Sequence, residues 1–495
     1  MQLKELASCV ENAKIVCGKQ NMQNSENTEI QGLSTHDAFC KDGDLFFCLC
    51  GEKTDSHLLA ADAIARGAVA VVCERELELP VPQIVVPSSR LAMSLIARAF
   101  YGNACDKLKI IGITGTNGKT TTAYMLDSIL RRAGKKTGLI GTLGIYYGKK
   151  KIAPELTTPD PVFLHSVFAD MSACGVEYVV MEVSAHALYY QKTAGITFAA
   201  CIFTNFSRDH LDFFGSMKDY KETKKKLFLE NLQSVAILNG DDPVGREIGK
   251  HCAKGKMKTV FYGLETPSES FAIVTAEDLT GCECMLNLSD ELCRVSLSLT
   301  GKHNVYNALA AATCATALGI QLEAVAGGLR SLSSVNGRLE RVASVNGAFV
   351  FVDFAHTPDG LEKSLSALKG YTKGKMICVF GCGGNRDRQK RPLMGEIAAK
   401  KTDFSILTSD NPRYEDPADI IAEIEKGYRR FSKNYVVIPE RKDALSYAIG
   451  LLKKGDTLLV AGKGGEDTQE IMGIKYSYND KTAIKEIVAR ITPLG

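Results

Sequence analysis

The sequence predicts an α/β protein of three domains, with a parallel or mixed sheet in the central domain and a Rossmann-like sheet in the C-terminal domain. Three observations support this fold class. The chain has 495 residues, which is more than one hydrophobic core usually serves. Short β-branched runs alternate with amphipathic stretches in two separate series. A glycine-rich turn near the start of the first series joins a strand pattern directly to a helix pattern.

The first domain is expected to span residues 1–103. Strand patterns at Leu45–Leu49 and Val69–Val72 lie on either side of an alanine-rich helix pattern at His57–Arg66. The charged segment Met1–Lys14 lacks the apolar core of a secretion signal, so we expect a cytoplasmic protein.

The central domain is expected to span residues 104–336. Its strand patterns are Lys109–Ile113, Glu177–Met181, Ala200–Phe203, Val235–Leu238 and Thr259–Phe261. Residues 271–299 are rich in strand patterns without a crossover helix, and Lys302–Leu318 has apolar residues at helical spacing.

A second series of strands and helices begins after Asn336-Gly337 and predicts a C-terminal domain over residues 337–495. Its strand patterns are Phe349–Asp353, Met376–Phe380, Phe404–Leu407, Tyr435–Ile438 and Thr457–Val460. The helical patterns between them are typical of a parallel sheet.

The composition excludes several classes of partner. The formal net charge is +3, from 60 basic and 57 acidic residues, so electrostatics do not favour nucleic acid or a membrane surface. No apolar run approaches the roughly 18 residues of a membrane helix. The sixteen cysteines are scattered without CxxC spacing. We interpret the pairs Cys48/Cys50 and Cys282/Cys284 as buried small residues in a reducing cytosol, and we expect a monomer.

The glycine-rich turn predicts a nucleoside triphosphate site. Strand Lys109–Ile113 leads into Thr114–Thr122 and then into the helix pattern Ala123–Arg132. Backbone amides and a helix N-terminus bind phosphate, a lysine neutralises its charge, and a threonine hydroxyl can hold Mg²⁺. A glycine turn alone is more often structural, and residue 113 breaks the usual GxxxxGK[ST] spacing. The predicted ATP-binding residues here are Gly115, Thr116, Asn117, Gly118, Lys119, Thr120 and Thr121.

Two later strands end in groups that suit a metal beside phosphate. Glu182 follows Glu177–Met181, and Asp209 and His210 follow Ala200–Phe203. The carboxyl ends of parallel strands are where open α/β sheets bind ligands, and carboxylate oxygen suits Mg²⁺. A single histidine would more often be structural.

The GxxGTNGKT variant at residues 112–120 resembles the Mur ligases and their folylpolyglutamate synthase relatives. The segments Met181–His186 and Thr204–Asp212 resemble the family's next motifs in order, which implies that Glu182 and His210 hold magnesium. Tyr220–Lys224 resembles the family's YxxxK, which implies that Lys224 is carbamylated and serves a second Mg²⁺. Without the resemblance, Lys224 within a run of lysines would indicate a solvated helix face.

Three further segments resemble the nucleotide-binding motifs of the family. They are Gly301–Ala308, Asn336–Glu340 and Val352–Asp359. The resemblance implies that Asn304, Arg338, Asp353 and His356 face ATP. Each segment alone has little specificity, and their common order carries the assignment.

Three turns in the C-terminal domain predict a pocket for the incoming amino acid. They are Gly381–Asp387, Asp410–Arg413 and Gly462–Glu466. Two arginines and a glutamate suit a zwitterion with more than one carboxylate. The turns resemble the branch of the family that adds the third residue of the peptidoglycan stem. This implies that Arg413 pairs with the distal carboxylate of meso-diaminopimelate, and that Arg386, Asn411, Gly462 and Glu466 complete the pocket.

The predicted binding site for the UDP-linked precursor is less typical of the family. Leu156–Pro159 matches a family segment, and the predicted binding residues are Ser34, Thr157, Thr158, Ser184, Tyr190 and Lys192. Tyr190 and Lys192 stand where the family tends to have Gln and Arg, His36-Asp37-Ala38 replaces DSR, and Gly465 replaces His.

The resemblance implies an ATP-dependent ligase that forms an acyl phosphate on the acceptor carboxylate. Lys119, Glu182, His210, Lys224 and Arg338 would be catalytic, and Thr120, Glu182, His210 and carbamylated Lys224 would serve two Mg²⁺ ions. Four alternatives remain open: the same ligase acting on L-lysine or another diamino acid, a folylpolyglutamate synthase type, an ATPase, and a paralogue that binds nucleotide and precursor without joining anything.

Overall fold

The computed structural model describes residues 1–17, 25–51, 54–153, 155–231 and 234–491. The chain forms two compact units. Unit 1 comprises Met1–Gly112 and Lys135–Ala199, and unit 2 comprises Ile113–Gly134 and Ala200–Gly495. The domain boundaries expected after residues 103 and 336 stay predictions. Across the residues described, no helix has both the length and the apolar character needed to cross a membrane.

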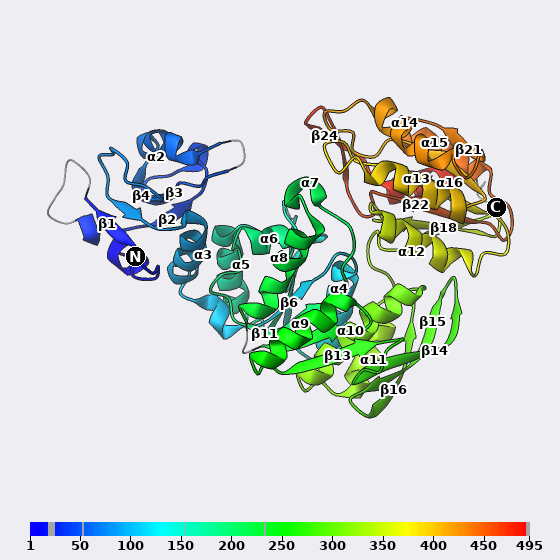
Figure 1. Ribbon diagram of the computed structural model, residues 1–495, viewed down its shortest axis with the longest axis horizontal. Coiled ribbons are helices and arrows are strands. Elements are labelled where there is room, and N and C mark those ends of the chain that lie inside the picture. Colours follow the sequence, from blue (N-terminus) through cyan, green and yellow to red (C-terminus); the bar gives the residue numbers. More distant parts are fainter. Residues whose placement is uncertain (18–24, 52–53, 154, 232–233, 492–495) are drawn as a thin grey trace. The chain divides into compact units, whose positions relative to one another are not determined.

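A five-stranded sheet forms the N-terminal part of unit 1 (Figure 1). Its order is β1 (Lys14–Val16), β5 (Gln83–Val85), β4 (Ala68–Cys73), β3 (Asp44–Phe47) and β2 (Gly32–Ser34), and only β1 is antiparallel. Leu45 and Phe47 pack with α1 (Leu3–Ala7) and α3 (Ser89–Phe100), whereas Phe46 packs with α2 (Ala60–Ala65) on the other face. Both faces are therefore buried, which explains why the strands are continuous apolar runs.

The helix expected at His57–Arg66 is shorter than predicted. A 3-10 turn covers Ser56–Leu59, and α2 follows from Ala60 to Ala65. Cys48 is buried as expected, but Cys50 lies beyond β3 and is exposed, so the interpretation of this pair as two buried cysteines is wrong for Cys50. Cys282 and Cys284 are both buried.

The rest of unit 1 carries the strands that deliver Glu182. Strand β10 (Tyr178–Glu182) pairs in parallel with β7 (Thr137–Gly141), and β8 (Gly144–Tyr147) and β9 (Lys150–Ile152) continue antiparallel. The helices are α5 (Pro161–Ala173) and α6 (Ala185–Tyr189). The division between the two units falls within β6 (Lys109–Thr114).

The first part of unit 2 combines parallel strands with an antiparallel meander. Strands β11 (Phe198–Phe203), β12 (Val235–Asn239) and β13 (Thr259–Gly263) are parallel. Strands β14 (Ser270–Asp278), β15 (Gly281–Leu288) and β16 (Glu291–Leu297) form the meander, which agrees with the strand-rich pattern expected at residues 271–299. The helices are α4 (Lys119–Arg132), α7 (Leu211–Phe214), α8 (Met217–Leu229), α9 (Pro243–Lys254), α10 (Lys302–Ala317) and α11 (Leu322–Ser331).

The second sheet of unit 2 has six strands with helices on both faces (Figure 1). The order is β17 (Glu340–Val345), β18 (Ala348–Asp353), β22 (Thr457–Ala461), β19 (Met376–Phe380), β20 (Phe404–Leu407) and β21 (Tyr435–Val437). Only β17 is antiparallel. Helices α12 (Pro358–Lys369), α13 (Lys390–Lys401) and α14 (Pro417–Tyr428) cover one face, and α15 (Arg441–Gly450) and α16 (Asp480–Ile491) cover the other.

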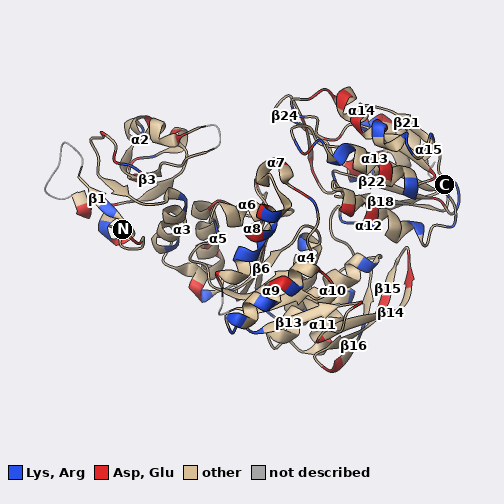
Figure 2. Ribbon diagram, in the orientation of Figure 1, with Lys and Arg blue, Asp and Glu red and all other residues tan. Residues whose placement is uncertain are grey.

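This sheet places three turns at one edge. The turns that follow β19, β20 and β22 all leave the carboxyl ends of parallel strands, so they emerge on the same side. A hairpin of β23 (Thr468–Ile471) and β24 (Ile474–Ser477) follows the third turn. Basic and acidic residues are interspersed along the helices of this part of the chain (Figure 2).

Candidate active site

The glycine loop after β6 is held by the segment that follows β11. The amide of Thr116 donates to the Asn205 carbonyl at 2.8 Å, and the amide of Asn117 donates to Asn205 Oδ1 at 3.0 Å. Gly118 has a φ of +85°, and a Cβ there would lie 2.3 Å from Asn307 Oδ1. Helix α4 starts directly after it, at Lys119, so the loop opens onto a helix N-terminus as an anion site requires.

Two charged side chains converge on this loop. Lys119 Nζ donates to the carbonyls of Gly115 at 2.9 Å and Thr116 at 2.8 Å. Arg338 Nη2 donates to Thr120 Oγ1 at 2.9 Å, and its guanidinium stacks over the Phe354 ring at 4.5 Å. Arg338 therefore joins the loop to the segment between the two sheets of unit 2.

Lys224 is buried beneath the same loop. Its side chain lies on α8 with 1% exposure, and Nζ donates to the Gly115 carbonyl at 2.8 Å. Tyr220, one helical turn earlier, places its ring 4.5 Å from Lys224 Nζ. Burial, together with the nearby charge of Lys119, holds the pKa of Lys224 well below its ordinary value. Lys224 therefore does not lie on a solvated helix face, and burial favours the neutral form of its amine.

Asp209 and His210 lie together at the end of the β11 loop. His210 Nε2 is 3.3 Å from Asp209 Oδ2. Burial opposes ionisation of Asp209, but electrostatic interactions with His210, His356 and Lys390 outweigh it and lower the pKa of Asp209. Burial lowers the pKa of His356 to about 4, and its Nδ1 contacts the Phe354 carbonyl at 2.8 Å.

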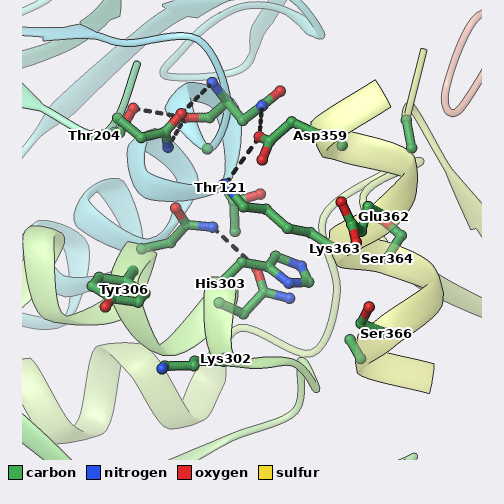
Figure 3. A pocket seen from close by; sticks show the side chains of 18 of the residues that line it. Thr121, Thr204, Lys302, His303, Tyr306, Asp359, Glu362, Lys363, Ser364 and Ser366 are labelled. Atoms are coloured by element: carbon green, nitrogen blue, oxygen red, sulfur yellow. Dashed lines mark hydrogen bonds and ion pairs between the residues drawn. The ribbon is translucent and has the colours of Figure 1, made fainter. Parts of the chain in front are cut away.

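A cavity of about 880 Å³ opens beside the loop, within unit 2 (Figure 3). This is a size typical of cofactor sites. Helix α10 contributes His303 and Tyr306 on one side, and α12 contributes Asp359 and Lys363 on the other. The predicted nucleotide residues that line it are Asn117, Gly118, Thr120, Thr121, Asn304, Arg338 and Asp353. Gly115, Thr116, Lys119 and His356 are not among the described residues that line it.

Two cavity residues were present in the quoted motifs without being singled out. Asp359 accepts hydrogen bonds from Asn117 Nδ2 at 2.7 Å and Ser207 Oγ at 3.2 Å, so it links α12 to the loop. Tyr306 donates to Asp241 Oδ2 at 2.7 Å. In the sequence, only their positions indicated a role, because Asp359 ends the segment Val352–Asp359 and Tyr306 lies within Gly301–Ala308.

Asp353 is the buried acid of this region. It accepts hydrogen bonds from the Leu339 amide at 3.0 Å and from Ser364 Oγ at 3.1 Å. Burial raises its pKa to about 6 despite the opposing charge of Arg338.

In unit 1, three of the six predicted precursor-binding residues lie around Glu182. Glu182 is buried at the end of β10 and accepts from the Thr142 amide at 2.9 Å. Thr157 Oγ1 lies 3.1 Å from Thr142 Oγ1, and Thr158 Oγ1 donates to the Glu182 carbonyl at 2.8 Å. The amide of Ser184 in turn donates to Thr158 Oγ1 at 3.0 Å.

The other three predicted precursor-binding residues, Ser34, Tyr190 and Lys192, contact residues outside the Glu182 group. Lys192 Nζ forms an ion pair with Asp160 Oδ1 at 2.7 Å. The guanidinium of Arg90 lies over the Tyr190 ring at 4.1 Å. Ser34, on β2, donates to the His36 carbonyl at 3.0 Å, and no hydrogen bond among the described residues joins it to the Glu182 group.

A second cluster in unit 1 does not suit a metal. Cys50, Asp55 and His57 place their ligand atoms within 4.8 Å of one another. However, His57 Nε2 accepts from the Glu74 amide at 3.0 Å, so Nδ1 carries the proton and donates to Asp55 Oδ1 at 2.6 Å. Neither ring nitrogen then has a free lone pair for a cation.

Hydrogen bonds join the three turns of the C-terminal sheet into one polar cluster. Lys463 is fully buried and donates to Asn411 Oδ1 and to Glu466 Oε2, both at 2.9 Å. Asn411 Nδ2 also donates to Glu466 Oε2 at 2.8 Å. The predicted residues Asn411 and Glu466 are thus brought together by Lys463, which was inside the quoted Gly462–Glu466 turn but was not assigned.

The arginines of this cluster lie where the three turns pack closely against one another. Arg413, with a left-handed φ of 52°, donates from Nη1 to the Gly384 carbonyl at 2.9 Å. A Cβ at Gly462 would lie 2.4 Å from Asp410 Oδ2, so this position needs glycine. Burial, together with the charge of Arg413, lowers the pKa of Arg386.

The glycine loop with a buried lysine, the cavity beside it and the polar cluster of the C-terminal sheet are together typical of an enzyme that acts on a nucleoside triphosphate and a second ligand. The Mur ligase middle domain matches residues 113–315, and the Mur ligase glutamate ligase domain matches residues 337–464. The chain belongs to the Mur ligase family, whose members are ATP-dependent ligases.

Similar proteins cover almost the whole chain. It is 42% identical to the UDP-N-acetylmuramoyl-L-alanyl-D-glutamate--2,6-diaminopimelate ligase of Caldanaerobacter subterraneus subsp. tengcongensis, over 95% of this chain and 97% of that one. The Geobacillus thermodenitrificans protein of the same name is 40% identical, over 93% and 95%.

Solved structures agree at the level of the fold. A structure titled as a ligase of the same name matches with a TM-score of 0.70 and 28% identity, covering 99% of both chains. MurF ligase from Thermotoga maritima in complex with ADP matches with a TM-score of 0.65 and 21% identity, covering 94% of this chain and 97% of that one.

Proposed function

We propose that the protein joins meso-diaminopimelate to UDP-N-acetylmuramoyl-L-alanyl-D-glutamate, with ATP as energy source, in peptidoglycan precursor synthesis. The names of the similar ligases support the two substrates. The observation that carries the proposal is the polar cluster at the edge of the C-terminal sheet. It combines Arg386 and Arg413 with buried Asn411 and Lys463 and with half-buried Glu466, which suits a ligand with two carboxylates and two amines.

In the first step, an oxygen of the acceptor carboxylate attacks the γ-phosphorus of ATP, and the bond from that phosphorus to ADP breaks. The product is an acyl phosphate. Lys119 and Arg338 lie at the glycine loop and would stabilise the charge on the transferring phosphoryl group. Phosphoryl transfer depends mainly on such positioning, because the protein forms no covalent bond to the group.

Lys224 suits the carbamate that the family resemblance implies. Carbamate formation needs a neutral amine, and burial favours that form in Lys224. Carbamylated Lys224, with Thr120 and His210 of the same unit, would hold Mg²⁺ through oxygen and imidazole donors. When bound, the ions supply positive charge at the transferring phosphoryl group.

In the second step, the neutral amine of the incoming amino acid attacks the acyl carbon. A carbon–nitrogen bond forms, the carbon–oxygen bond to phosphate breaks, and the amine loses a proton to solvent or to the departing phosphate. Asn411 and Glu466 would orient the amino acid, because Lys463 fixes both side chains. Ser34, Thr157, Thr158, Ser184, Tyr190 and Lys192 would bind the precursor. We further propose that the enzyme works as a cytoplasmic monomer.

The test is phosphate release by the purified protein with ATP, Mg²⁺ and the UDP-linked dipeptide, comparing meso-diaminopimelate with L-lysine, ornithine and glutamate. Release that strongly favours meso-diaminopimelate supports the proposal. Preference for another amine keeps the ligase and overturns the pocket assignment. Release without consumption of any amine indicates an ATPase, and no release with any amine indicates a binding protein.

A further inference from the structure

The hairpin β23–β24 brings a carboxylate to Arg413. The amide of Arg413 donates to the Glu470 carbonyl at 3.0 Å, and the amide of Met472 donates to the Arg413 carbonyl at 2.6 Å. The amide of Glu470 also donates to Asn411 Oδ1 at 3.0 Å. The backbone at Glu470 is therefore fixed to the same turn that carries Asn411 and Arg413.

The side chains of Glu470 and Arg413 form an ion pair that leaves polar atoms open. Glu470 Oε2 lies 3.1 Å from Arg413 Nε, and the two side chains are 28% and 20% exposed. Arg413 Nη1 donates to the Gly384 carbonyl. Within the described part of the chain, Arg413 Nη2 and Glu470 Oε1 have no hydrogen-bond partner. The turn after β19 and the turn after β20 hold the pair in place, and the pair still presents Arg413 Nη2 as a donor and Glu470 Oε1 as an acceptor.

An open guanidinium nitrogen beside an open carboxylate oxygen complements an α-amino acid end, which carries a carboxylate beside an ammonium. Lys463 is already paired with Glu466, so it does not offer this combination. From this geometry we infer that Glu470 is a specificity-determining residue: Arg413 binds the distal carboxylate of the incoming amino acid, and Glu470 binds its distal ammonium. The inference rests on the proposed function and adds a residue to it.

This arrangement makes the site a receptor for a zwitterionic distal end. A ligand with a distal carboxylate and no distal amine would leave Glu470 Oε1 without its partner. A ligand with the amine alone would leave Arg413 without its carboxylate. Unpaired polar groups in a half-buried pocket are costly, so both ligands bind more weakly than meso-diaminopimelate.

The test compares E470Q with wild-type protein on two ligands, meso-diaminopimelate and L-2-aminopimelate, which lacks only the distal amine. Glutamine has the same shape and keeps an oxygen for Arg413 Nε, but it loses the charge that binds ammonium. We expect E470Q to raise KM for meso-diaminopimelate about tenfold, with kcat changed less than about twofold. KM for L-2-aminopimelate should stay within about twofold of the wild-type value.

The matched control is E486Q, because Glu486 is an exposed acid on α16 that pairs with Lys442 on α15. It should leave both KM values unchanged. Titration calorimetry of each ligand with the full-length protein, in the presence of the precursor and a non-hydrolysable ATP analogue, gives the same comparison without turnover.

An equal fold-change for both ligands would overturn the inference, because Glu470 would then act only by placing Arg413. If E470Q fails to fold, the wild-type protein decides: equal KM values for the two ligands overturn the inference, and a tenfold preference for meso-diaminopimelate supports it. Failure of the proposed function is distinguishable, since wild-type protein would then show no preference for meso-diaminopimelate over L-lysine.

Discussion

Replacing Gly118 by alanine tests whether the glycine loop is built as the structure shows. Gly118 has a φ of +85°, and an added Cβ would lie 2.3 Å from Asn307 Oδ1. Asn307 cannot move without loss, because its Nδ2 donates to Asn304 Oδ1 at 3.1 Å and its Oδ1 accepts from Thr122 Oγ1 at 3.3 Å. Gly118→Ala therefore combines backbone strain with the loss of two buried hydrogen bonds.

The cost can be divided into these two parts. An alanine in the left-handed region costs about 1 kcal/mol, and each of the two hydrogen bonds contributes about 1 kcal/mol to stability. Gly118→Ala should lower the free energy of unfolding by about 3 kcal/mol on these figures. Gly134, just after the same helix, is the matched control. It has a φ of +75° with nothing within 4 Å of an added Cβ, so Gly134→Ala should show only the strain.

The assay is the urea midpoint of each variant, with ATP-dependent phosphate release measured in parallel. The double variant Gly118→Ala/Asn307→Ala removes the atom that the Cβ would meet. Its cost should be about 2 kcal/mol less than the sum of the two single costs. Equal costs for Gly118→Ala and Gly134→Ala, or strict additivity in the double variant, would refute the reasoning.

Two further predictions concern buried titratable side chains. Lys224→Arg should lower phosphate release by about 100-fold or more, because a guanidinium cannot form the proposed carbamate; Lys226→Arg, on the same helix, should keep near wild-type activity. A Lys224→Arg variant with normal activity would exclude the carbamate. His165 in α5 is buried, and burial lowers its pKa from 6.5 to about 4, so the unfolded chain binds a proton there more readily. Its contribution is fully present above pH 6.5 and is lost as the pH falls toward 4, by at most about 3 kcal/mol. His165→Leu should reduce the fall of the urea midpoint between pH 7.5 and 4.5. An unchanged pH dependence of the midpoint would contradict the lowered pKa of His165.

Local patterns were sufficient for the main elements. The strands β18, β19 and β20 follow the predicted runs closely, because strands buried on both faces are continuous apolar segments. Boundaries were less accurate. Helix α4 starts at Lys119 rather than Ala123, since the threonines at 120–122 have low helix propensity and gave no helical signal, whereas the whole of α4 packs against α10 and α11.

The predicted site residues were mostly named from motifs, whereas their partners came from packing. Asp359 and Lys463 were inside the quoted segments, but nothing local distinguishes a charge that bridges two segments from one that faces water. Glu470 lies outside every quoted motif, and its relation to Arg413 depends on how the hairpin meets the preceding turn.

The sequence by itself determined the two series of strands and helices, the phosphate loop and the family resemblance, because apolar periodicity and glycine placement act over a few residues. Only the tertiary structure decided that Lys224 is buried under the loop, that Lys463 joins Asn411 to Glu466, and that Glu470 lies beside Arg413. These contacts join residues from separate elements, and burial rather than residue type sets the charge state of a lysine such as Lys224.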